Sequence, residues 1–298
     1  MNQVAILGST GMLGRAVSRI SPRNCRLIEI NRAPEPVEPS NSHFRIAKSI
    51  SEIEAFLKLG NITHLINCAG LIRQKMGQES PSDMSRAIES NVQIPLKLAE
   101  LSERYGFKII QIGTDCVFSG REGNYTEADK HSPIDLYGKT KSLGEISHPN
   151  LTIIRASIVG VESNSNKSLL SWLLAHPLNS EINGFSDHLW NGITVLQFAK
   201  LIEGLINQGN MDDLNGTHHF VPRDSVSKFE LLGLIAKAFN RNDLVVRPVE
   251  SERPANMTLS TVNAAFNESL WKMAGYLTIP SVDEMILEYS KSMTLESH

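Results

Sequence analysis

Three residues in the middle of the chain have side chains suited to delivering a proton. Thr114 follows an apolar run at 109–113, and Tyr137 and Lys141 lie four residues apart, which on a helix puts both on one face. A free tyrosine has a pKa of ~10, and a nearby ammonium group lowers it by favouring the phenolate. Isolated Tyr-x-x-x-Lys pairs are common on surface helices, so the interpretation depends on the surrounding motifs. On that condition, we expect Tyr137 to exchange a proton with a reacting oxygen that Thr114 also hydrogen-bonds.

A glycine-rich turn near the start of the chain has the pattern of a nucleotide-binding loop. Gly8, Gly11 and Gly14 separate an apolar run at 3–7 from a helical stretch at 15–20. Glycines permit a tight turn and let the backbone approach a pyrophosphate, whose charge a helix N-terminus stabilises. We therefore expect this turn to hold a dinucleotide.

The end of the second apolar run bears on which dinucleotide is bound. The residue after such a strand usually meets the adenosine ribose, where a carboxylate favours NAD and an arginine suits a 2′-phosphate. Here residues 26–30 are followed by Asn31 and Arg32. We interpret Arg32 as the phosphate clamp, which favours NADPH and leaves NADH open. The alternatives are a solvated Arg32, or Glu29 as the ribose ligand of a shorter strand.

Apolar runs typical of strands alternate with helical stretches up to residue 160. Strands are expected at 3–7, 26–30, 64–68, 108–113 and 151–155, and helices at 15–20, 51–59, 83–105 and from Ser132-Pro133 onward. This alternation predicts an α/β fold with a Rossmann-type, doubly wound parallel sheet in residues 1–160, whose ligands bind at the C-terminal strand ends. Residues 161–298 are expected to be mainly a smaller α/β substrate-binding lobe, with 191–221 packing back on the first domain. Capping boxes predict three later helices, at Thr194–Gln197, Ser227–Glu230 and Ser281–Glu284.

Composition narrows the class of protein. The 298 residues carry a net charge of −3 with both signs mixed along the chain, which argues against a nucleic-acid partner. The three cysteines have no paired spacing, and no apolar run approaches the ~20 residues of a membrane span. Without a visible targeting segment, a cytoplasmic protein is expected. No metal site is expected, because His218 and His219 alternate across a predicted strand and no zinc-type spacing occurs.

Taken together, these residues resemble the extended short-chain dehydrogenase/reductase superfamily, in particular its dTDP-4-dehydrorhamnose reductase-like branch of sugar-nucleotide 4-keto reductases. The matching segments, in the family's order, are 8–14, 66–70, 91–92, 113–120, 125–127, 137–141 and 155–157, with a weaker match around Arg253-Pro254. The chain departs from the family at Cys116, where an aromatic residue is usual.

The resemblance implies an NAD(P)H-dependent reductase of a nucleotide-activated 4-keto-6-deoxy sugar, acting in deoxysugar or surface-polysaccharide biosynthesis. Its catalytic residues would be Thr114, Tyr137 and Lys141. Residues implied to contact the cofactor are Tyr137, Lys141, Gly8, Thr10, Gly11, Met12, Leu13, Arg32, Cys68, Ala69, Gly70 and Asn91. Residues implied to contact the sugar nucleotide are Thr114, Asp115, Val117, Asp187, His188 and Arg253. The resemblance is compatible with a homodimer and leaves the sugar, the base and the product stereochemistry open.

Other functions fit the same frame. A C4 epimerase would keep NAD tightly bound, so nicotinamide absorbance of the purified protein would reveal it. A 4,6-dehydratase is disfavoured because no glutamate accompanies Asp115 beside Thr114. A non-catalytic NADP-binding regulatory subunit would bind NADPH without oxidising it, and the complete set of Thr114, Tyr137 and Lys141 argues against that role.

Overall fold

A parallel sheet organises the chain. The computed structural model describes residues 2–20, 23, 25–31, 43–46, 49–59, 61–76, 80–162, 167–208 and 214–295. Within these residues the sheet has seven strands, all paired in parallel. Their order across the sheet is β11 (Gly216–His219), β6 (Leu151–Arg155), β5 (Lys108–Gly113), β4 (His64–Asn67), β1 (Asn2–Leu7), β2 (Cys25–Asn31) and β3 (His43–Ile46). The predicted Rossmann-type sheet is confirmed, and β3 is an addition that the sequence did not predict.

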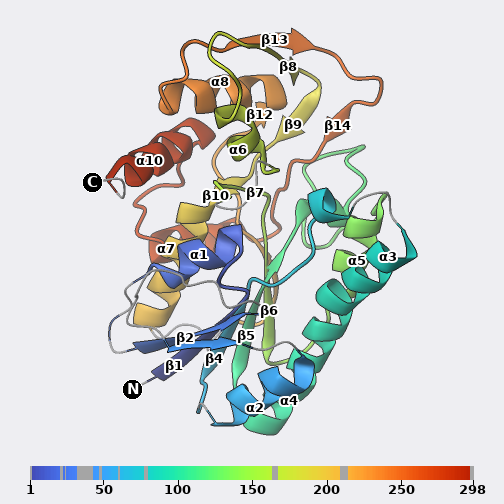
Figure 1. Cartoon of the computed structure of the whole chain (residues 1–298), viewed down its shortest axis with the longest axis vertical. Helices are drawn as coiled ribbons and strands as arrows, with labels where there is room; N and C mark the ends of the chain where they lie inside the picture. The colour runs from blue at the N-terminus through green and yellow to red at the C-terminus, as the bar shows by residue number, and fades with distance from the viewer. Residues whose placement is uncertain are drawn as a thin grey trace.

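Helices cover both faces of the sheet (Figure 1). On one side lie α1 (Met12–Ser18) and α7 (Val195–Gln208), and on the other lie α2 (Ile50–Leu59), α3 (Pro81–Ile88), α4 (Ile94–Tyr105) and α5 (Leu136–Leu143). Strand side chains alternate between these layers: Val4 and Ile6 of β1 pack in one core cluster, and Ala5 and Leu7 in the other. Burial on both faces explains why the strands appear in the sequence as uninterrupted apolar runs.

The helical stretch predicted at 83–105 is three elements rather than one. A π-helical turn at Glu89–Gln93 separates α3 from α4. Pro95 explains the break, because proline lacks an N–H and its ring clashes with the carbonyl four residues earlier, here that of Asn91. The turn places the Asn91 side chain inside the protein, where it is 2% exposed.

The helix that carries Tyr137 and Lys141 begins later than predicted. Ser132 does not cap it, because the Ser132 hydroxyl accepts the N–H of Ser119 at 3.0 Å. Instead α5 begins at Leu136, and the Asp135 carboxylate accepts the Gly138 N–H at 2.7 Å. The four-residue spacing of Tyr137 and Lys141 lies wholly inside α5, so the two side chains still share a face.

Most of the chain beyond residue 160 forms a smaller α/β region at the end of the sheet where the strands finish (Figure 1). The remaining elements are β7 (Ile158–Val159), α6 (Leu169–Leu174), β8 (Glu181–Phe185), β9 (His188–Trp190), β10 (Ile193–Thr194), β12 (Val226–Ser227), α8 (Lys228–Ala238), β13 (Val245–Val249), β14 (Ala255–Asn256), α9 (Ala264–Met273) and α10 (Val282–Leu295). The capping boxes that begin at Ser227 and Ser281 are present. At Thr194, by contrast, the hydroxyl accepts from Leu196 rather than from Gln197.

Candidate active site

The predicted functional residues of the first half lie along one edge of the sheet. Because the strands are parallel, their C-terminal ends meet there, and Gly8, Cys68, Thr114 and Ala156 directly follow β1, β4, β5 and β6. Between β1 and β4 the strand order reverses direction, and such a switch point is where open α/β sheets bind ligands.

The glycine loop after β1 has the backbone form that a dinucleotide requires. Gly8 has φ +83°, in the left-handed region, and a Cβ on Gly14 would lie 2.1 Å from the Gly8 carbonyl oxygen. A Cβ on Gly11 would instead meet only the Gly8 oxygen, at 3.4 Å. The loop is therefore closed on its helix side and open at Gly11, which fits the close approach of a pyrophosphate to backbone. The two residues after Gly11 differ in burial. Met12 is half-buried, whereas the Leu13 side chain packs in the core, so Leu13 can offer a ligand only its backbone.

Two of the residues considered for contact with the adenosine ribose lie in the described part of the chain, Glu29 and Asn31. Arg32 lies outside the described residues. Glu29 is fully buried inside β2, which continues to Asn31, so the alternative of a shorter strand with Glu29 at its end is wrong. Asn31 itself ends the strand and contacts Thr10 of the glycine loop.

Thr114, Asp115 and Tyr137 meet at the end of β5. Thr114 is buried. Its hydroxyl donates to Asp115 Oδ1 at 3.1 Å and accepts the Cys116 N–H at 3.3 Å. Thr114 also lies close enough to the phenol of Tyr137 to lower its pKa. A hydroxyl and a phenol thus converge at the sheet edge, as the sequence predicted.

Lys141 lies one turn further along α5, behind Tyr137. Its Nζ donates to the Ile112 carbonyl at 2.8 Å, and the residue is 7% exposed. The helix can pack this close to the end of β5 because residue 138 is glycine: a Cβ there would lie 2.2 Å from the Cys116 carbonyl oxygen.

Burial dominates the proton affinities of this pair. Desolvation raises the pKa of Tyr137 well above its ordinary value, as does the nearby Cys116, while the hydrogen bond with Thr114 lowers it. Desolvation lowers the pKa of Lys141, opposed by Glu145 and Cys68. The expectation that Lys141 would bring the Tyr137 pKa down is therefore wrong for the chain alone, because loss of solvent around the phenol is the larger effect. Tyr137 is held as the protonated phenol, the form that donates.

A buried ionic network supports Lys141 from behind. Glu145, one turn after Lys141, accepts from Arg155 Nη2 at 2.5 Å, and both side chains are 2% exposed. The same guanidinium donates to His131 Nε2 at 3.0 Å and to His219 Nε2 at 2.6 Å. Arg155, the last residue of β6, therefore joins the segments on either side of α5 to β11, and the sequence motifs did not point to this network.

Asn91 positions other residues near the predicted cofactor contacts. Its Oδ1 accepts the Leu71 N–H at 2.8 Å, and its Nδ2 donates to the Leu71 carbonyl and the Thr140 hydroxyl, both at 3.0 Å. Asn91 thereby ties the loop after Cys68, Ala69 and Gly70 to α5, so its contacts support the site rather than present a free amide to a ligand.

The residues predicted to contact the substrate differ in their exposure and in their contacts within the protein. Val117 is fully buried among Phe118 and Tyr125, which leaves its backbone for a substrate, and its contact with one stays a prediction. Arg253 is exposed, and its carbonyl lies 3.2 Å from His188 Nε2. Asp187 Oδ2 accepts the backbone N–H and the hydroxyl of Ser251 at 2.8 and 3.0 Å.

These last contacts define a latch, formed by Asp187, His188 and Ser251. His188 Nε2 lies 2.9 Å from the Ser251 hydroxyl, and its ring stacks on Phe185 at 4.5 Å. The latch fastens the turn between β8 and β9 to the chain after β13. The structure thus gives Asp187 and His188 partners within the lobe, and their contact with substrate stays a prediction.

One cation near the site was missed in the sequence. Lys228, the first residue of α8, holds its Nζ 5.0 Å from the ring centroid of Trp190, whose Nε1 donates to Ser157 at 2.7 Å. Burial lowers the pKa of Lys228, and the charges of Asp115 and Cys116 oppose that shift. A lysine at the first position of a predicted helix gives no sequence signal, because it is ordinarily solvated.

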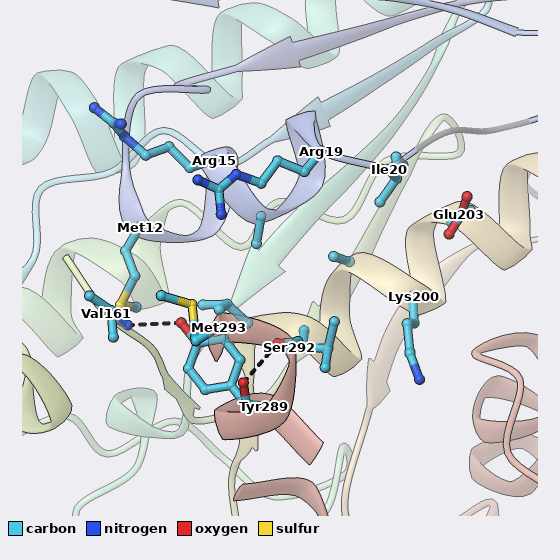
Figure 2. A pocket seen from close by; sticks show the side chains of 14 residues that line it. Met12, Arg15, Arg19, Ile20, Val161, Lys200, Glu203, Tyr289, Ser292 and Met293 are labelled. Atoms are coloured by element: carbon cyan, nitrogen blue, oxygen red, sulfur yellow. Dashed lines mark hydrogen bonds between the residues drawn. The ribbon is translucent and has the colours of Figure 1, made fainter. Parts of the chain in front are cut away.

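A separate hollow of about 330 Å³ lies between α1, α7 and α10 (Figure 2). Met12, Arg15, Lys200 and Tyr289 are among its lining residues, and of the predicted site residues it includes Met12 alone. Tyr289 closes one end by accepting the Val161 N–H at 3.1 Å. This hollow lies on the helix side of the glycine loop, away from Thr114 and Tyr137.

The described part of the chain lacks both a metal-binding cluster and a membrane-spanning helix. No group of three or more His, Cys, Asp or Glu side chains there is arranged to hold a metal ion. Among the helices described, none combines the length and apolar character needed to cross a bilayer.

Known proteins match this chain over nearly its whole length. The family model for the RmlD substrate binding domain matches residues 1–294. Methionine adenosyltransferase 2 subunit beta of Rattus norvegicus is 28% identical over 285 residues, covering 86% of this chain and 80% of its own. The dTDP-4-keto-6-deoxy-D-glucose reductase of Streptomyces niveus is 23% identical over 280 residues, covering 92% and 91%. The dTDP-4-dehydrorhamnose reductase of Bacillus anthracis, solved with NADP, has a similar fold, with a TM-score of 0.76, 23% identity and coverage of 98% and 100%. This chain belongs to the RmlD substrate binding domain family.

Proposed function

We propose that the chain is an NADPH-dependent reductase, able to use NADH as an alternative, that reduces the C4 ketone of a nucleotide-activated 4-keto-6-deoxy sugar. The observation that carries the proposal is the convergence of Thr114 and Tyr137 at the end of β5, with Lys141 buried one helical turn away and its Nζ on the Ile112 carbonyl. Two hydroxyl groups that converge on one point suit a carbonyl oxygen that gains a proton. The glycine loop lies at the same edge of the sheet, so the residues that would hold the cofactor face the same place.

Each of the three side chains has a distinct part in the proposed reaction. A bound nicotinamide would supply the hydride to C4. Tyr137 gives its proton to the developing alkoxide, and its raised pKa keeps that proton in place until the oxygen becomes basic. Lys141 stabilises the phenolate left behind, and Thr114 turns its hydroxyl from Asp115 towards the sugar oxygen.

We also infer which half of the chain binds the cofactor and which binds the substrate. We assign cofactor binding to residues 1–160 and substrate binding mainly to 161–298, with 191–221 belonging in part to the first. This assignment is supported by β11, which pairs with β6 in the central sheet, and by α7, which packs against α1.

The names of related proteins agree with this reaction class. The Streptomyces niveus relative, matched over 91% of its length, is named as a keto-sugar reductase, and the Bacillus anthracis neighbour was solved with NADP. A nucleotide sugar is therefore the substrate to test first.

The decisive experiment follows absorbance of NADPH while a panel of 4-keto-6-deoxy sugar nucleotides is offered to the protein and to Tyr137→Phe. We expect turnover by the wild type and a loss of roughly 10²-fold or more in the variant. Tyr105→Phe is the matched control, because Tyr105 hydrogen-bonds Glu54 at 3.0 Å on α2, away from the site. Equal turnover by wild type and Tyr137→Phe would end the assignment.

A second function is favoured by a specific observation. Relatives named methionine adenosyltransferase 2 subunit beta, from several vertebrates, cover 86% of this chain at up to 28% identity. As a regulatory subunit, the chain would bind NADPH, leave it unoxidised with every sugar of the panel, and change the activity of a methionine adenosyltransferase catalytic subunit on mixing. Turnover of any keto sugar that depends on Tyr137 would instead favour the reductase.

A further inference from the structure

Lys228 brings a positive charge close to the proposed proton-transfer site. It is half-buried at the first position of α8, and its Nζ lies 5.0 Å from the ring centroid of Trp190. Among the residues that the structure describes, none accepts a hydrogen bond from this ammonium or forms an ion pair with it. Contact with an aromatic face does not replace the three hydrogen bonds that an ammonium makes in water. Its donors are therefore available to a ligand.

The contacts of Trp190 place Lys228 relative to the sheet. Trp190 Nε1 donates to the Ser157 hydroxyl at 2.7 Å. Ser157 lies two residues beyond the end of β6, Asp115 lies two residues beyond the end of β5, and the last residues of these two strands pair in register. Ser157 and Asp115 therefore leave neighbouring strands at the same level, and Trp190 carries Lys228 to the strand end at which the proposed reaction takes place.

The surroundings of Lys228 favour an anion. The N-terminus of a helix carries a partial positive charge, so a second positive charge there is unfavourable. The one acidic side chain in the first turn of α8, Glu230, takes part in the capping box, where it accepts the N–H of Ser227 at 2.7 Å. Burial also disfavours the ammonium and lowers the pKa of Lys228. An anion bound at Nζ would relieve both effects.

The proposed substrate has one group of permanent negative charge, its diphosphate. We expect the pyrophosphate of the dinucleotide at the glycine loop after β1, and β4 separates β1 from β5 in the sheet, so the cofactor does not supply this anion. In a nucleotide sugar, the phosphate on C1 lies across one sugar ring from C4. A sugar whose C4 oxygen meets Thr114 and Tyr137 therefore keeps its C1 phosphate near the ends of β5 and β6.

We propose that Lys228 binds the sugar-bearing phosphate of the nucleotide sugar, and that this contact makes the chain accept activated rather than free keto sugars. The ammonium donates to the phosphate oxygens, and the ring of Trp190 holds it in place. The inference rests on the proposed function in taking a nucleotide sugar as the ligand. Nucleotides that have no ketone test it separately from the reaction.

The experiment compares nucleoside diphosphates with monophosphates, because only the diphosphate includes the phosphate that carries the sugar. Dissociation constants for dTDP, UDP, GDP and CDP, each beside its monophosphate, are measured by calorimetry with NADPH added to occupy the cofactor site. Lys228→Met removes the charge, and Lys228→Arg keeps it. Lys237→Met, at an exposed position in the last turn of α8, is the matched control.

We expect the wild type to bind at least one diphosphate roughly tenfold or more tightly than its monophosphate, and Lys228→Met to lose that advantage. Lys228→Arg should keep it at least in part, and Lys237→Met should keep all of it. The affinity for NADPH should be the same in all four proteins. The melting temperature of Lys228→Met should equal or exceed that of the wild type, because a desolvated charge has been removed. A lysine with a structural role alone would lower the melting temperature and leave the ratio unchanged.

An unchanged ratio in Lys228→Met, or an equal loss for diphosphate and monophosphate, would overturn the inference. A matching loss of NADPH affinity would assign the ammonium to the cofactor and overturn it as well. If the wild type binds no diphosphate more tightly than its monophosphate and still reduces a keto sugar, the inference falls and the reductase proposal stands. A ratio that depends on Lys228, without turnover of any keto sugar, upholds the inference and leaves the reductase proposal to fall.

Discussion

Two polar clusters, one at the C-terminal edge of the sheet and one in the smaller α/β region, are built in opposite ways. In the first, Thr114 comes from the end of β5 and Tyr137 and Lys141 from α5, so residues on separate elements converge on one point. In the second, the latch, Asp187 and His188 are neighbours at the turn between β8 and β9, and both contact Ser251. The first cluster gathers groups that can act on a ligand, and the second uses its groups to fasten its own loops.

The surroundings of the clusters sharpen the contrast. Lys141 is buried, and the ion pair between Glu145 and Arg155 lies close to it. Both side chains of that pair are 2% exposed. Asp187 is half-buried, and the hydrogen bonds from Ser251 outweigh the effect of burial and lower its pKa. A charged group held in place by a second buried pair is rigid before any ligand arrives, which is what proton transfer requires.

The largest expected effect comes from removing the buried ammonium of the first cluster. Lys141→Met should lower kcat for a 4-keto sugar by roughly 10²- to 10⁴-fold, because the phenolate of Tyr137 loses its stabilising charge. Lys139→Met, on the exposed side of the same helix, is the control and should retain activity. Steady-state kinetics with NADPH measure both, and equal kcat values would remove the distinction between the two clusters.

Removal of the support behind Lys141 should cost stability first. Arg155→Met leaves Glu145 buried without its guanidinium and should lower the free energy of unfolding by about 3–5 kcal/mol. Adding Glu145→Gln should restore part of that loss, since the uncompensated charge is then gone. Urea unfolding of the single and double variants completes the cycle, and purely additive losses would show that the two side chains are not coupled.

The same network makes stability depend on pH. His219 donates from Nδ1 to the Ser260 carbonyl at 2.6 Å and accepts from Arg155 at Nε2, so it is neutral. Burial first, and then the charge of Arg155, lower the pKa of His219 to about 4. The unfolded chain, with a histidine pKa of ~6.5, takes up the proton first, so stability should fall by about 3 kcal/mol as the pH drops from 6.5 towards 4. His219→Gln should flatten that part of the unfolding profile, and an identical profile in both proteins would assign the loss to other groups.

The contrast between the clusters also explains what the sequence could predict. Thr114, Tyr137 and Lys141 lie at a strand end and one helical turn apart, and periodicity alone brings such positions together. The latch depends on where the chain returns after β13, more than sixty residues past Asp187, and no local pattern encodes that return. The predicted start of α5 at Ser132 is wrong for the same reason: a partner distant in the sequence decides it. The Ser132 hydroxyl accepts the N–H of Ser119, on the other side of a loop, and so does not cap the helix.

The burial and the partners of the charged side chains could not be predicted from the sequence either. Arg155 looked like the end of an apolar strand, yet it contacts Glu145, His131 and His219 from three separate segments. Lys228 begins α8, where a lysine is ordinarily solvated, yet its Nζ lies over the ring of Trp190. Burial sets the proton affinity of a side chain, and burial is a property of the assembled fold, so the raised pKa of Tyr137 could not be foreseen from the spacing of Tyr137 and Lys141.

The smallest expected effect would test the latch itself. Asp187→Asn keeps one oxygen to accept from Ser251 but loses the charge that strengthens that bond, so the free energy of unfolding should fall by about 1 kcal/mol. If the latch only fastens loops, KM and kcat for the keto sugar should change less than roughly threefold, far below the effect of Lys141→Met. Ser251→Ala, which removes the hydroxyl and keeps the backbone donor, should match Asp187→Asn in both measurements. A large rise in KM for Asp187→Asn, without one for Ser251→Ala, would mean that the Asp187 carboxylate contacts the sugar nucleotide, as the sequence predicted, and that the second cluster binds ligand as the first does.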